Sequence, residues 1–203
     1  KASNGQKMGT LCLLDSVPRS LGVEDIAALQ DLAAMVEAEL AAVQLASQDE
    51  LTGISNRRGF LQLAQHCLRF YAQKGQPSTL FFLDIDKFKE INDEFGHAEG
   101  DLALKEFAML LQSTFRTSDV YARLGGDEFV VLQGNANKVQ AETGISKFLA
   151  ALDSYNVQAG RGYEISCSYG IVEYDPGKHT GIETMLAESD TLMYALKKTK
   201  NQE

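Results

Sequence analysis

The sequence is poor in cysteine and contains no long run of apolar residues. Its three cysteines (Cys12, Cys67 and Cys167) are an odd number, are widely spaced and form no CxxC pair. This pattern favours free thiols in a reducing compartment over a disulfide framework or a zinc site. No apolar run approaches the roughly 18–20 residues that cross a bilayer, and the first residues do not resemble a signal peptide. We therefore expect a cytoplasmic location and no membrane segment in this chain.

Positive charge is also in short supply. The chain has 19 Lys and Arg against 28 Asp and Glu, which gives a formal net charge of −9. A balance of this sign argues against a broad nucleic-acid or membrane-binding surface. If the ligand is itself anionic, metal ions and a few local lysines must neutralise it. The hydrophobic content of 44% over 203 residues is ordinary for globular proteins. It suffices for one domain of about 150–170 residues and a smaller piece.

The most informative stretch is Arg123-Leu124-Gly125-Gly126-Asp127-Glu128-Phe129. Apolar side chains alternate before it, and residues 129–132 form a short apolar run after it, so we expect a β-hairpin. The two glycines permit positive φ and leave no side chain over the turn. Asp127 and Glu128 repel each other, so the pair suits a site that also holds a cation. The four letters alone fit a solvated turn equally well.

A second acidic group follows the apolar strand expected at residues 78–84, in Asp84-Ile85-Asp86. If this strand end lies beside the hairpin tip, the carboxylates of Asp84 and Asp127 come together. Mg²⁺ prefers oxygen ligands and commonly uses one or two carboxylates plus substrate phosphates. Two such ions can activate an attacking oxygen and stabilise a leaving pyrophosphate, and Lys89 could reach a triphosphate. Alternatively, Asp84 and Asp86 only cap the following turn and Lys89 is solvated.

The remaining periodicity predicts helices and one further strand. We expect helices at residues 24–48, 59–74, 99–114, 136–152 and 182–198, and strands at residues 9–15 and 163–174. The first helix carries a heptad pattern of Ile26, Leu29, Ala33, Val36, Leu40 and Val43. This pattern fits either a parallel coiled coil between two chains or a helix packed on its own neighbouring domain.

Residues 47–199 resemble a GGDEF domain, the catalytic module of diguanylate cyclases. The resemblance rests on several ordered motifs, namely Asp49 to Arg58, Asp84 to Lys89, Ile91-Asn92-Asp93, Phe95-Gly96-His97, Gly100-Asp101, Arg123 to Phe129 and Ser168-Tyr169-Gly170. It implies an α/β (α+β) nucleotidyl-cyclase palm, in which helices flank a central, mostly antiparallel sheet. It also implies the condensation of two GTP molecules to cyclic di-GMP and two pyrophosphates, in a homodimer whose two domains face each other.

The resemblance assigns roles to individual residues. Asp84, the carbonyl of Ile85 and Asp127 would bind Mg²⁺, with Mn²⁺ as the alternative ion. Asp127 would also accept the proton of the 3′-hydroxyl, and Glu128 would assist metal binding or charge balance. The guanine and nucleoside would contact Asn92, Asp101 and His97. The phosphates would contact the backbone at Lys87 and Phe88, the glycines Gly125 and Gly126, and the lysines Lys89 and Lys197.

Two further features complete the resemblance. Arg116-Thr117-Ser118-Asp119 has the position of the family's RxxD inhibitory site, where Arg116 and Asp119 would bind cyclic di-GMP. The last helix departs from the family pattern, because Lys200-Asn201 replaces the usual Gly-Arg pair. A second basic phosphate contact must therefore come from Lys200 or be absent.

The N-terminal residues resemble the end of a GAF sensor domain, through Gly9-Thr10-Leu11-Cys12-Leu13. We thus expect a sensor remnant at residues 1–23, a signalling helix at 24–48 and a cyclase domain at 49–203. The leading hypothesis is a product-inhibited diguanylate cyclase controlled through that helix. A catalytically silent module that binds GTP or cyclic di-GMP is the alternative, and a cyclase for another purine nucleotide is a third.

Overall fold

The structure is a computed structural model that describes residues 9–200, apart from the side chain of Gln44. The chain divides into two compact units, residues 1–46 and 47–203. The boundaries expected from the sequence, between a sensor remnant and a helix at residue 23 and between that helix and the cyclase domain at residue 48, stay predictions. Within residues 9–200, no helix combines the length and the apolar character that a membrane crossing requires.

The first unit contains helix α1, Val23–Leu45, where the sequence predicts a helix. Four members of its heptad pattern (Ile26, Val36, Leu40 and Val43) are 40–47% exposed. The prediction of a buried strand at residues 9–15 is wrong, because these residues form no strand and Leu13 is 64% exposed. A strand needs neighbouring strands to satisfy its hydrogen bonds and bury its side chains. The choice between a coiled coil and a packed helix stays a prediction.

The second unit is built on a five-stranded sheet in the order β1-β3-β4-β2-β5. Its strands are β1 (Ser55–Asn56), β2 (Ser78–Ile85), β3 (Val120–Gly125), β4 (Glu128–Gly134) and β5 (Cys167–Glu173). Only the β1–β3 pair is parallel, and the other three pairs are antiparallel. The expected mostly antiparallel sheet and the expected hairpin of β3 and β4 are confirmed.

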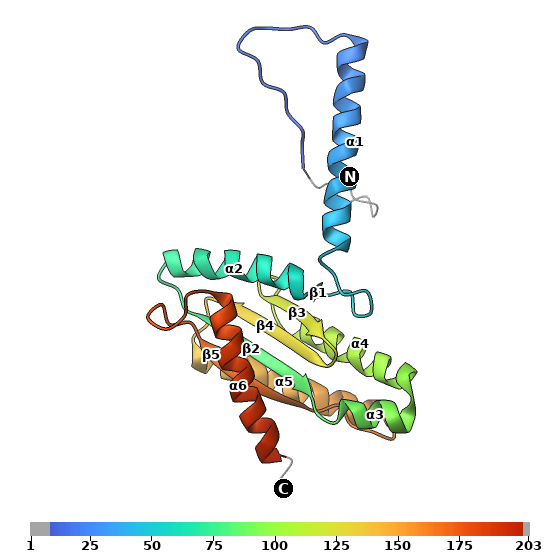
Figure 1. Ribbon diagram of the computed structural model, residues 1–203, viewed down its shortest axis with the longest axis vertical. Helices are drawn as coiled ribbons and strands as arrows, with labels where there is room; N and C mark the ends of the chain where they lie inside the picture. Colours follow the sequence, from blue (N-terminus) through green and yellow to red (C-terminus); the bar gives the residue numbers. More distant parts are fainter. Residues whose placement is uncertain (1–8, 201–203) are drawn as a thin grey trace. The chain divides into compact units, whose positions relative to one another are not determined.

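Strand β2 is buried along its whole length and supplies side chains to two hydrophobic cores. Phe81, Leu83 and Ile85 pack with helices α4 (His97–Thr114) and α5 (Lys138–Ala159). Leu80 and Phe82 pack with helices α2 (Arg57–Gln73) and α6 (Ile182–Lys200). This alternation is the period of two that strands impose. The second unit is therefore a sheet covered by two helices on each face (Figure 1).

Local signals explain where several elements differ from expectation. Helix α3, Phe88–Phe95, occupies a stretch in which no element was predicted, since eight residues give little periodicity. Helix α5 begins with a capping box between Asn137 and Gln140 and ends at Gly160, whose φ of 55° permits a left-handed C-cap. It therefore runs beyond the predicted end at residue 152. Strand β5 is shorter than predicted and starts only at Cys167.

Helix α6 crosses strand β5 unusually closely at Gly170. A β-carbon added at Gly170 would lie 2.7 Å from the backbone nitrogen of Met193, and closer still to the carbonyl oxygen of Ser189. Only glycine lets the two backbones approach this far. The contact sets the height of α6 above the sheet, and Lys197 lies one helical turn beyond Met193.

Candidate active site

The expected acidic residues converge at the end of β2. Asp84 lies opposite Glu128 on β4 and opposite Ser168 on β5. The backbone N–H of Ile85 donates to the carbonyl of Asp127 at 3.2 Å, so the hairpin tip touches the strand end. Asp84 is only 8% exposed. It follows Leu80 and Phe82 in the alternation, so its side chain lies on the face that α6 covers.

The ammonium of Lys197 on α6 donates a hydrogen bond to the carboxylate of Asp84. Burial raises the pKa of Asp84, and the charges of Asp127 and Asp86 add to this rise against the opposing effect of Lys197. Burial lowers the pKa of Lys197, but the bond to Asp84 and the surrounding carboxylates outweigh it, so this pKa is raised overall. The cluster thus carries excess negative charge around one internal cation.

Glu128 belongs to the same electrostatic cluster. Its pKa is raised by burial first, then by the charges of Asp190 and Asp84, while Arg57 acts in the opposite direction. A carboxylate in this environment gains from any added positive charge.

The donor set fits a magnesium ion that also binds substrate phosphates. Within residues 9–200, no group of three or more His, Cys, Asp or Glu side chains could hold a metal alone. Asp84 and Asp127 supply two carboxylates, and the carbonyl of Ile85 adds a neutral oxygen. Mg²⁺ commonly uses one or two carboxylates and completes its shell with phosphate and water. The ammonium of Lys197 already stands as a cation on Asp84, which shows that this position accepts positive charge.

The turn after β2 is held rigidly. Asp86 accepts hydrogen bonds from Ser168 at 2.6 Å and from Lys200 at 2.9 Å. Lys87 has a φ of 54°, a left-handed conformation that turns the strand into α3 within one residue. Phe88 begins α3, and Lys89 is exposed on its first turn. The free backbone N–H groups at such a helix start are suited to phosphate oxygens.

The predicted guanine-binding residues gather at the corner between α3 and α4. The side chains of Asn92 and His97 approach each other at 3.2 Å, and the amide of Asn92 donates to the carbonyl of Phe88 at 3.2 Å. A β-carbon at Gly100 would lie 2.9 Å from the Asn92 side-chain carbon Cγ, so Gly100 permits this contact. Asp101 is exposed on the following turn.

Arg123 is a residue to which the sequence prediction gave no role. Its guanidinium donates to the carbonyl of Gly126 at 2.9 Å and pairs with the carboxylate of Asp49 at 3.1 Å. Gly126 itself has a φ of 52°, and Gly125 has a φ of 147°. Burial opposes ionisation of Asp49, but hydrogen bonds from Thr52 and Arg123 lower its pKa overall. This pair anchors the glycine turn, and the sequence separation of 74 residues gave no local signal for it.

Arg116 and Asp119 lie together at the start of β3. The carboxylate of Asp119 is buried and accepts from the backbone N–H of Arg116 at 3.0 Å. Burial raises the pKa of Asp119, against hydrogen bonds from Arg116 and Gln133. Both residues line a cavity of about 270 Å³ that also includes Gln133 and Lys147. Arg116 and Asp119 therefore line a cavity whose lining does not include Asp84 or Asp127.

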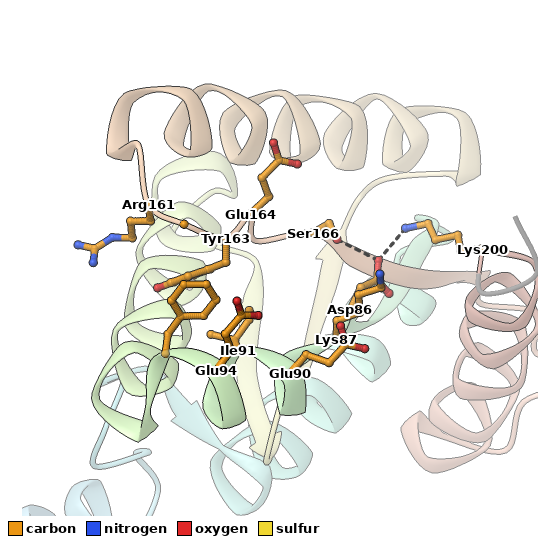
Figure 2. Close-up of a pocket in the computed structure, with 12 residues that line it drawn as sticks. Asp86, Lys87, Glu90, Ile91, Glu94, Arg161, Tyr163, Glu164, Ser166 and Lys200 are labelled. Atoms are coloured by element: carbon orange, nitrogen blue, oxygen red, sulfur yellow. Dashed lines mark hydrogen bonds and ion pairs between the residues drawn. The ribbon is translucent and has the colours of Figure 1, made fainter.

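A cavity of about 610 Å³ lies beside α3, and its lining does not include Asp84 or Asp127. Figure 2 shows it between α3 and the segment 161–166, with Asp86 bonded to Ser166 and Lys200 at one end. Lys200 also donates to the carbonyl of Cys167 at 2.7 Å. Its ammonium is thus engaged on Asp86 and on the backbone, whereas Lys197 reaches the carboxylate cluster.

A comparison with known families agrees with this arrangement. The profile described as diguanylate cyclase, GGDEF domain matches residues 46–203. The chain belongs to the GGDEF domain family. This GGDEF chain is 38% identical to the probable diguanylate cyclase DgcE of Escherichia coli K12 over 153 residues, which are 75% of the chain and 14% of DgcE. It is 32% identical over 154 residues to the cyclic di-GMP phosphodiesterase PdeR of the same organism, covering 75% of the chain and 23% of PdeR.

A solved structure shows the same fold. The coiled coil and GGDEF domain of DgcB from Caulobacter crescentus, in complex with cyclic di-GMP, superposes with a TM-score of 0.72. Its sequence is 26% identical, and the match covers 86% of this chain and 94% of the solved one. The GGDEF chain described here spans less than a quarter of DgcE or PdeR, so its similarity concerns one domain of those longer proteins.

Proposed function

We propose that this chain is a magnesium-dependent diguanylate cyclase that condenses two GTP molecules to cyclic di-GMP. The observation that carries the proposal is the meeting of Asp84 and the Asp127 hairpin at one strand end, where Lys197 of α6 donates a hydrogen bond to Asp84. The raised pKa values of Asp84 and Glu128 show that these carboxylates destabilise the fold unless a cation offsets their charge. Family membership supports the same activity.

The proposal assigns a task to Asp127, to the lysines Lys197 and Lys89, and to the metal ligands. Asp127 accepts the proton of the 3′-hydroxyl as its oxygen attacks the α-phosphate of the second nucleotide. The bond between the α-phosphate and the pyrophosphate then breaks. Lys197 and Lys89 bind phosphate oxygens and offset their charge. Asp84, Asp127 and the carbonyl of Ile85 would hold Mg²⁺, which would supply activation of the attacking oxygen and charge neutralisation of the leaving pyrophosphate.

Recognition of the base would fall to the α3–α4 corner. Asn92 and Asp101 can accept from the N1–H and N2–H₂ donors of guanine, a pattern that adenine does not offer. His97 would contact the nucleoside, since its ring already touches Asn92. The backbone of Lys87 and Phe88 would cradle the phosphates together with the open turn at Gly125 and Gly126.

Two finer parts of the proposal concern assembly and control. Each domain would bind one GTP, so the reaction needs two domains that face each other. Helix α1 would pair two chains through its exposed heptad residues. Arg116 and Asp119 would bind cyclic di-GMP and inhibit the enzyme. The solved DgcB relative contains both a coiled coil and cyclic di-GMP, which is compatible with both parts. We also propose that residues 1–23 derive from a GAF-like sensor, that the location is cytoplasmic, and that no nucleic acid is bound.

A binding module without turnover is the second candidate. It is favoured by PdeR, a relative named for cyclic di-GMP phosphodiesterase activity, which shows that this type of domain also occurs in proteins named for another reaction. The presence of Asp84, Asp127, Glu128 and Lys89 favours the cyclase instead.

The decisive test incubates the purified protein with GTP and Mg²⁺ and measures pyrophosphate and cyclic di-GMP. We expect both products, and we expect Asp127→Asn to abolish them without lowering the thermal midpoint. Arg116→Ala should raise activity in the presence of accumulated product. If neither the native chain nor Arg116→Ala forms product, while GTP still binds, the module without turnover is the correct description.

A further inference from the structure

The segment at residues 161–163 contacts the α3–α4 corner through Glu99 and Phe95. Arg161 donates to the Glu99 carboxylate at 2.7 Å, and the hydroxyl of Tyr163 donates to the same oxygen at 2.9 Å. The rings of Phe95 and Tyr163 pack with centroids 5.1 Å apart. A β-carbon on Gly162 would lie 2.7 Å from the Phe95 ring, so the ring rests directly on the backbone. We name Glu99, Arg161 and Tyr163 the corner brace.

The corner is held locally by the contacts of Asn92 with His97 and Gly100, but its joint has no side-chain cap. Phe95 ends α3, Glu99 lies in the first turn of α4, and only Gly96 separates the two helices. Gly96 has a φ of 89°, and no side chain caps the start of α4. A helix start without a cap and a glycine joint leave the interhelical angle weakly determined by the local sequence. Contacts from outside the corner must therefore contribute to it.

The brace is itself fixed at its far end. The side chain of Asn156 on α5 bonds both the backbone N–H and the carbonyl of Ile165 at 2.9 Å. Beyond Ile165, Ser166 accepts from the backbone N–H of Asp86 at 2.9 Å, and Ser168 donates to the Asp86 side chain. The segment 161–168 thus connects the base-binding corner to the turn that follows Asp84. Figure 2 shows Tyr163 and Ser166 at the two ends of this connection, along one wall of the large cavity.

The hydrogen bond from the hydroxyl of Tyr163 is the contact of the brace that we expect to contribute most to holding the corner. Its partner is a carboxylate, and hydrogen bonds to charged groups are stronger than neutral ones. Burial and the bond to Glu99 raise the pKa of Tyr163 to about 12, so the hydroxyl remains a donor throughout the working pH range. The pair of Arg161 and Glu99 is about one-third exposed on each side, so solvent weakens its contribution.

We propose that the corner brace is a positioning device for base selectivity, in which Tyr163 and Glu99 hold α4 at the angle that presents Asp101 and Asn92 to guanine. This inference rests on the proposed function. Neither residue touches the nucleotide in this scheme. Loosening the corner moves Asp101 away from the exocyclic amine first, because Asp101 lies one turn along α4 from the joint.

The test measures binding without turnover, so that activity and dimerisation do not enter. The probes are 3′-deoxy-GTP, which lacks the attacking hydroxyl, and 3′-deoxy-ITP, which also lacks the exocyclic amine of guanine. Dissociation constants are measured with Mg²⁺ by calorimetry for the native chain, Tyr163→Phe and Glu99→Gln. Tyr163→Phe retains the ring on Phe95 and removes only the donor. Lys105→Ala, an exposed change on the same helix, is the matched control.

We expect both brace variants to weaken the guanine probe by about three- to thirtyfold, the effect of losing about one hydrogen bond. The inosine probe should weaken less, so the ratio of the two constants falls toward one, and Lys105→Ala should leave the ratio unchanged. Equal weakening of both probes, or an unchanged ratio, would overturn the inference, because a purely structural role lowers both affinities together. If the native chain binds neither probe, or binds both equally, the proposed function fails at guanine recognition instead.

Discussion

Gly170→Ala is the substitution whose effect the structure determines most directly. The added β-carbon would lie 2.7 Å from the nitrogen of Met193, about 1 Å inside ordinary contact distance. The atoms that it would meet are backbone atoms of α6, so no side chain can turn away, and α6 must lift from β5. Overpacking of this kind costs about 1–3 kcal/mol. We expect the upper end, about 3 kcal/mol, because Met185, Leu186 and Met193 of the displaced helix are buried.

Urea unfolding followed by circular dichroism measures this cost. With a denaturant dependence of about 2 kcal/mol/M, the midpoint should fall by about 1.5 M. Gly144→Ala is the matched control, because its β-carbon would meet the movable end of Gln133 at 3.2 Å and the Phe115 ring at an ordinary contact distance of 3.5 Å. Alanine also favours a helix interior over glycine by roughly 0.5–1 kcal/mol. An unchanged midpoint for Gly170→Ala would mean that α6 does not lie on β5 as the structure has it.

Three further predictions concern charge and hydrogen bonding in the same unit. Glu128→Gln should stabilise the metal-free domain at pH 7 by about 0.5 kcal/mol after solvent screening; the raised pKa of Glu128 means that this gain disappears as the pH falls and the native carboxyl protonates. Lys197→Met should cost about 1–2 kcal/mol at pH 7, since Asp84 loses its cation. Part of the lost stability should be recovered at acidic pH, because the pKa of Asp84 is raised and its protonation removes the unpaired charge. Thermal unfolding at several pH values tests both, and a pH-independent difference would contradict either. His179→Ala should cost about 2 kcal/mol in urea unfolding, because His179 is buried, accepts from the Asp175 N–H and donates to Glu188, each at 2.9 Å; a loss below 0.5 kcal/mol, on the order of one exposed contact, would contradict the packing of this loop.

The sheet could be predicted from the sequence because its signals are local. Continuous apolar residues mark β2, and the Gly125-Gly126 turn marks the hairpin, so the positions of these strands follow from short segments. Helix α3 escaped prediction because eight mostly polar residues do not display a helical period. The failed strand at residues 9–15 has a strand-like composition, but among the described residues it has no strand to pair with.

The proximity of Asp84 to the Asp127 hairpin could be predicted from the sequence, whereas most side-chain contacts of the candidate site could not. The meeting of Asp84 and Asp127 follows from two strand ends. By contrast, Lys197 and Asp84 are 113 positions apart, and Tyr163 and Glu99 are 64 apart. Such pairs depend on how helices cross the sheet, which the periodicity of neither segment specifies. The hydrogen bond from Lys200 to Asp86 also joins distant parts of the sequence, and the sequence did not determine whether Lys200 binds phosphate.

The hydrogen bond from Lys197 to the Asp84 carboxylate affects the free energy with which a divalent ion would bind there. An incoming ion would not fill a vacant place but would exchange with an internal cation that already stabilises the fold. The exchange would free the Lys197 side chain to bind a phosphate of the substrate. Thermal stabilisation by the ion alone should therefore understate the intrinsic affinity of the carboxylates for the ion, because the displacement of Lys197 lowers the net stabilisation.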